Sequence, residues 1–85
     1  MPLPYITDEA HIEKSGFDEN HDVYYDVRIA EFGIVVRVTI SPPTMKHLDW
    51  YWCSIPPNWL HTDDEAKRAK QIAKEIVVFH RCNYV

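Results

Sequence analysis

A period of two in the apolar side chains, over residues 23–29 and again over 34–40, most constrains what this chain can fold into. A period of two places successive side chains on opposite faces of a β-strand. Residues 31–33 separate the two runs, and their glycine allows the positive φ that tight connections between strands need. The sequence therefore predicts a β-hairpin with one apolar face.

A third strand is predicted for residues 49–55, where aromatic side chains are frequent. In this run Trp50 and Trp52 fall on one side of the strand. Proline pairs at 42–43 and 56–57 bound the segment, because proline has no amide hydrogen for a paired strand. The three strands then follow one another as an antiparallel meander.

The segment after the third strand has the start signal of a helix. Thr62 and Glu65 have the spacing of a capping box, in which each side chain bonds a backbone amide that the first helical turn leaves without a partner. We expect a helix over residues 62–82. Its apolar side chains recur at helical spacing and form a stripe that suits packing on a sheet: Ala66, Ala69, Ile72, Ala73, Ile76, Val77 and His80.

Residues 1–22 are polar and weakly periodic, so we interpret them as an acidic N-terminal arm. With no repeat and no flexible linker, the 85 residues form one domain. The predicted fold class is α+β: a three-stranded antiparallel sheet over residues 23–55, the arm, and one C-terminal amphipathic helix packed on one face. The other face, which carries Tyr24, needs the arm or a partner to cover it.

Charge is unevenly distributed around the net value of -4. Residues 1–31 hold eight acidic and two basic side chains, whereas residues 32–85 hold five acidic and seven basic ones. No run approaches the roughly 20 apolar residues of a membrane span, and the N-terminus has no signal-peptide pattern. Two cysteines are too few for a disulfide framework, which suits a reducing compartment, so we expect a cytoplasmic protein without a membrane partner.

Catalytic and metal-binding patterns are weak. Neither cysteine stands where a helix start or a nucleophile turn would activate it, and two glycines leave no room for a glycine-rich phosphate loop. A zinc site built from Cys53, His80 and Cys82 is an alternative, although their spacing is unusual for zinc. We expect no catalytic residues, no metal and no cofactor.

Three groups of side chains remain as candidates for binding. Aromatic residues are enriched at interface hot spots, since they bury a large rigid area. The aromatic candidates are Tyr24, Trp50, Trp52 and Trp59. An acidic surface would use Asp18, Glu19, Asp22 and Asp26, and a basic helix face would use Lys67, Arg68, Lys70 and Lys74.

The leading hypothesis is a small non-catalytic protein-binding module. It would be an inhibitor or adaptor of the phage or mobile-element type, an antitoxin-like protein or a nucleic-acid mimic. It would bind another protein through the acidic arm, a sheet edge or the exposed aromatics. Self-association into a homodimer would hide an open edge. The alternative is a nucleic-acid-binding regulator that contacts phosphates with the basic helix.

Overall fold

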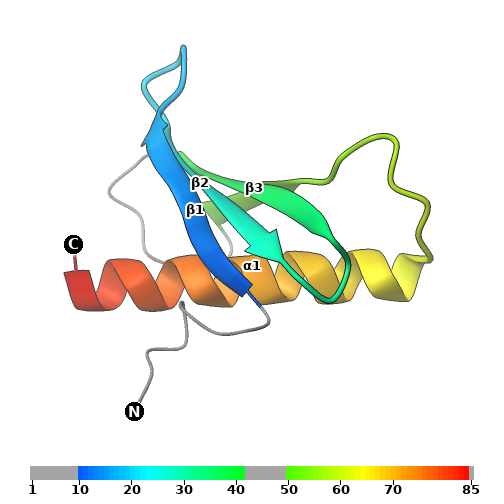
Figure 1. Cartoon of the computed structure of the whole chain (residues 1–85). Helices are drawn as coiled ribbons and strands as arrows, with labels where there is room; N and C mark the ends of the chain where they lie inside the picture. Colours follow the sequence, from blue (N-terminus) through cyan, green and yellow to red (C-terminus); the bar gives the residue numbers. More distant parts are fainter. Residues whose placement is uncertain (1–9, 42–49, 85) are drawn as a thin grey trace.

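The computed structural model describes residues 10–41 and 50–84. Within them, four strands and one helix follow in the order β1 (Ala10–Phe17), β2 (Val23–Ile29), β3 (Ile34–Ile40), β4 (Tyr51–Ser54) and α1 (Asp63–Tyr84). The strands form one antiparallel sheet in the order β1-β2-β3-β4. The helix α1 lies across one face of this sheet (Figure 1). The predicted α+β class is confirmed.

The predicted hairpin is the centre of the sheet. β2 and β3 pair from Val23 opposite Ile40 to Ile29 opposite Ile34, without a break in register. Gly33 has a φ of 64°, and its N–H donates to the Ile29 carbonyl at 2.9 Å, which closes the connection. The glycine thus stands where the chain needs a left-handed residue.

The predicted strand count is wrong by one, because part of the supposed arm is β1. This strand pairs with β2 from Ala10 opposite Ile29 to Phe17 opposite Val23. The register shifts between Ile12 and Lys14, so the alternation is interrupted there. A bulged edge strand that is largely exposed carries little periodic signal, which explains why its sequence resembles an arm. Residues 1–9 of the predicted arm lie outside the described residues.

The third predicted strand is found as β4, which is shorter than the predicted 49–55. Tyr51 and Cys53 face α1, whereas Trp52 lies on the opposite face, as the alternation predicted. Trp50 immediately precedes the strand, and residue 49 lies outside the described residues.

The helix begins with the predicted capping box. The Thr62 amide donates to the Glu65 carboxylate at 3.0 Å, and the Glu65 amide donates to the Thr62 hydroxyl at 3.2 Å. Both amides are thereby bonded at a helix start where no carbonyl of the preceding turn is available. The predicted range of 62–82 differs from the observed α1 only at its ends.

The core lies between α1 and the sheet. From the helix, Ala69, Ala73, Ile76 and Val77 are buried, which confirms most of the predicted stripe. The small alanines let the helix backbone approach the branched side chains of β2 and β3. The buried sheet residues are Ala10, Tyr25, Val27, Ile29, Ile34, Val36, Val38, Ile40 and Tyr51. Among the described residues, no helix is long and apolar enough to cross a membrane.

Candidate functional site

The face of the sheet that α1 does not cover is the first candidate surface. We call it the uncovered face and define it by Tyr24, Asp26, Arg28, Val35, Arg37, Thr39, Trp52 and Ser54. The strand register places Tyr24 opposite Thr39, and Thr39 opposite Trp52, in one row across three strands. Trp52 is 53% exposed, although tryptophan is usually well buried. Tyr24 and Trp52 are therefore the two register neighbours of Thr39 on this face.

A second row holds an ion pair. The Arg37 Nε donates to Asp26 Oδ1 at 2.8 Å and its second nitrogen reaches Oδ2 at 3.2 Å, a two-pronged contact. This hydrogen bonding raises the pKa of the Arg37 guanidinium above its ordinary value. The same guanidinium lies 4.1 Å from the centre of the Tyr24 ring. Arg37 and Tyr24 thus hold each other in a defined orientation.

Two adjoining hollows lie beyond the ion pair. One, of about 440 Å³, is lined by residues that include Asp26, Arg37 and Ser54. The other, of about 390 Å³, is lined by residues that include Arg28 and Phe32. Val35 and Pro56 line both of them. The hollows therefore adjoin as one shallow depression, which polar and apolar side chains line together.

The predicted aromatic residues divide into two groups. Trp52 and Tyr24 share the uncovered face, and Trp50, which is 45% exposed, stands two residues before Trp52. Trp59 instead stacks on the His61 ring, at 4.5 Å between centroids, and packs against Phe32. It closes one end of the core and lines the smaller hollow. The structure therefore brings only part of the predicted aromatic set onto one face.

Three of the four residues of the predicted acidic surface lie in the loop between β1 and β2, and part of the set is engaged in structure. The Asp18 carboxylate accepts the amides of Asn20 and Asp22, both at 2.9 Å, and so shapes the loop between β1 and β2. Glu19 is exposed and Asp22 is half-buried in that loop, which projects away from α1 (Figure 1). Asp26 lies on the uncovered face and is paired with Arg37.

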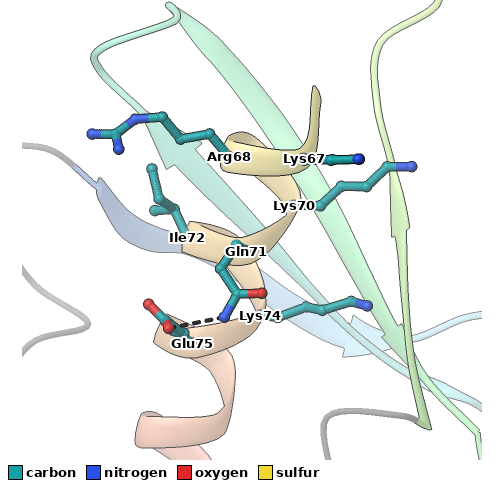
Figure 2. A pocket seen from close by; sticks show the side chains of 7 residues that line it. All are labelled: Lys67, Arg68, Lys70, Gln71, Ile72, Lys74 and Glu75. Carbon is teal, nitrogen blue, oxygen red and sulfur yellow. Dashed lines mark hydrogen bonds between the residues drawn. The ribbon is translucent and has the colours of Figure 1, made fainter. Parts of the chain in front are cut away.

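The predicted basic helix face also separates into two parts. Arg68 donates to the Glu31 carboxylate at 3.0 Å, across to the loop between β2 and β3. Lys67, Lys70 and Lys74 project to the other side of α1 (Figure 2). We call these three side chains the lysine row. Arg68 projects away from this row, although all four bases line the same shallow hollow on α1.

A buried polar group at the end of α1 was not predicted from the sequence. Arg81 is only 4% exposed and donates to the Tyr25 hydroxyl at 3.2 Å. The His80 ring packs edge-on against Tyr25, at 5.6 Å between centroids. Burial, followed by the charge of Arg81, lowers the pKa of His80, and burial raises the pKa of the Tyr51 phenol. The sequence signal that could have indicated a buried polar partner was Tyr25, which places a hydroxyl on the apolar face of β2.

The described cysteines and histidines do not gather into a metal site. Within residues 10–41 and 50–84, no group of three or more His, Cys, Asp or Glu side chains could hold a metal ion. Cys53 lies between β4 and the helix, where its Sγ is 3.7 Å from the Lys70 carbonyl oxygen. Burial raises the pKa of this thiol. The zinc alternative with Cys53, His80 and Cys82 is therefore not assembled in these residues.

Comparison with known proteins adds no family. No protein-family model matches the chain, and searches of curated proteins and of solved structures find no significant match.

Proposed function

We propose that this protein is a small non-catalytic protein-binding module that contacts its partner through the uncovered face. The observation that carries the proposal is Trp52, 53% exposed in the same row as Tyr24. A half-exposed tryptophan on a regular sheet gains free energy when a partner removes its remaining surface from water. Such anchors supply much of the affinity of protein interfaces.

The neighbouring groups suit a protein partner. The depression around Val35 and Pro56 can take an apolar side chain next to the aromatic row. Two arginines border it, and each is paired with a carboxylate: Arg28 with Glu13, and Arg37 with Asp26. Apolar contacts at the centre with paired charges around them are the usual anatomy of an interface. An inhibitor or an adaptor would use the same surface.

The nucleic-acid alternative has less support. Sheet-face recognition of single strands combines exposed aromatics with a positively charged groove. On the uncovered face Asp26 offsets Arg37, and on α1 the Glu31 carboxylate engages Arg68. The lysine row alone is a small footprint for phosphates.

A capture experiment with matched variants tests the proposal. Tagged protein is incubated with native lysate, with and without nuclease, and bound proteins are quantified by mass spectrometry. We expect a stoichiometric partner that resists nuclease, is kept by Leu60→Ala and is lost by Trp52→Ala. Leu60 is a suitable control because it is 95% exposed in the loop before α1.

Two results would contradict the proposal. Equal recovery of the partner by Trp52→Ala and the wild type would place the binding elsewhere. Recovery of nucleic acid, with all proteins lost after nuclease treatment, would favour the regulator alternative. Sedimentation equilibrium of the purified chain tests the homodimer proposal separately. If the partner is a second copy, Trp52→Ala shifts the protein to a monomer.

A further inference from the structure

The lysine row has no acidic partner in the described structure. Lys67, Lys70 and Lys74 make no ion pair with a described carboxylate, whereas Arg68 on the same helix does. Their side chains line a shallow hollow on α1, of about 720 Å³, together with Arg68, Ile72 and the Gln71–Glu75 hydrogen-bonded pair. Three like charges on one side of a helix repel one another, so an anionic ligand would be favoured there.

The lysine row lies next to β4. The Cys53 Sγ is 3.7 Å from the Lys70 carbonyl oxygen, and the positive charges of Lys74 and Lys70 both act on this thiol. β4 is the last strand in the sheet order, and no described strand pairs with its outer edge. Along that edge, alternate residues direct backbone N–H and C=O groups away from β3.

We propose that β4 accepts an extended segment of another protein as an added strand, with acidic side chains of that segment paired to the lysine row. The spacing fits this occupant. Lys70 and Lys74 are separated by about 6 Å along the helix axis, and alternate residues of a strand are separated by about 6.6 Å. Acidic side chains at two alternate positions of an added strand that runs along the helix would therefore meet Lys70 and Lys74, whereas Lys67 and Lys70 are only about 4.5 Å apart along the axis.

The opposite face of the added strand would lie beside Trp52. Its side chains at the intervening positions should therefore be apolar, so the preferred segment alternates acidic and apolar residues. A nucleic acid could pair with the lysines but could not complete the hydrogen-bonding edge of β4. The β4 edge with the lysine row adjoins the uncovered face at Trp52, but binding there does not require the depression at Val35 and Pro56.

Fluorescence anisotropy with a synthetic probe tests the inference. The probe is a labelled peptide in which glutamate alternates with valine and threonine. We expect it to bind the wild-type protein and to bind Lys74→Glu at least about tenfold more weakly, since reversing one charge converts attraction to repulsion. Lys14→Glu is the matched control, because it makes the same charge change at an exposed position on β1. Circular dichroism verifies that both variants are folded.

Three outcomes would overturn the inference. The first is equal weakening by Lys14→Glu and Lys74→Glu, which would indicate a general charge effect. The second is unchanged binding when the backbone amides of the probe are N-methylated at alternate residues, with one probe methylated at the odd positions and another at the even positions. Strand addition needs the amides of one of these two sets. The third is tighter binding of a labelled oligothymidylate than of the peptide at about physiological salt, with the same dependence on Lys74. The two proposals can fail separately. If Trp52→Ala loses the partner in the lysate capture but Lys74→Glu binds the probe as well as the wild type does, only the proposed function is upheld.

Discussion

Arg81 shows how a single residue can connect the helix to the sheet. It extends from the last turns of α1 into the core and donates to the Tyr25 hydroxyl on β2. This bond uses one terminal nitrogen of the buried guanidinium and gives the Tyr25 hydroxyl a hydrogen-bond donor. The contact fixes the position of the helix end over the hairpin.

Arg81→Met tests this role, because methionine keeps an unbranched apolar stem and removes the donors. We expect the free energy of unfolding to fall by about 1–3 kcal/mol, the usual cost of leaving a buried polar group unbonded. Urea denaturation measures the loss. Arg28→Met is the control, since its exposed pair with Glu13 is worth about 1 kcal/mol or less. Equal losses in both variants would show that the Tyr25 contact is not stabilising.

The two thiols should differ in reactivity for a local physical reason. Cys53 is half-buried beside α1 and burial raises the pKa of its thiol, so little thiolate forms near neutral pH. Cys82 is exposed near the end of the helix. We therefore expect iodoacetamide to modify Cys82 well before Cys53, as followed by mass spectrometry over time. In denaturant the two rates should become similar; similar rates in the folded protein would contradict the burial of Cys53.

At the scale of elements, the start of α1 depends on local contacts alone. Thr62 and Glu65 are close in sequence and satisfy each other's amides, so neither bond requires the sheet. Thr62→Ala removes the hydroxyl acceptor and should lower the free energy of unfolding by about 1 kcal/mol.

Thermal denaturation measures this change, and Thr62→Ser provides the matched control because it keeps the hydroxyl. The serine variant should unfold close to the wild-type temperature. A serine variant as unstable as the alanine variant would mean that the threonine methyl group, and not the cap, stabilises the helix start.

The elements also explain which predictions from sequence succeeded. The hairpin of β2 and β3 was predictable because both strands have one buried face and a complete alternation, with Gly33 between them. β1 was not predictable, since a bulge at Glu13 interrupts its alternation and much of its length is exposed. Its strand conformation depends on hydrogen bonds to β2, which local residue preferences do not report.

At the scale of the whole molecule, stability should depend on pH through His80. Burial and the nearby Arg81 charge lower the pKa of His80 below its ordinary value of 6.5, so the folded state disfavours the protonated ring. As the pH falls through 6.5, the unfolded chain takes up this proton more readily than the folded one, and stability decreases. Stability lost this way returns when the pH rises above 6.5.

Urea denaturation at about pH 7.5 and about pH 5.5 measures this effect. The wild type should lose stability on acidification, and His80→Phe should lose less, although its absolute stability also differs. The comparison of the two changes isolates His80 from the carboxylates, which titrate in both proteins. An identical loss in both would show that His80 makes no contribution.

The candidate surfaces show the same division between local and long-range information. The sequence indicated that Trp52 lies on the opposite side of its strand from Tyr51 and Cys53, and the strand register shows that this side is the one that carries Tyr24. The sequence could not indicate that Arg37 would lie over Tyr24. Nor could it indicate that Arg68 would bond Glu31 and so project away from the lysine row. Long charged side chains choose among several neighbours, and only the packed structure decides which neighbour is within reach.

The sequence by itself determined the hairpin, the third of its predicted strands and the capped helix, since each is encoded by a period or by contacts between near residues. Tertiary structure alone decided that residues 10–17 join the sheet, that Arg81 is buried against Tyr25, and that the lysine row lies beside β4. These features join residues far apart in the chain. Their free energy comes from pairing and burial that exist only once the helix lies on the sheet.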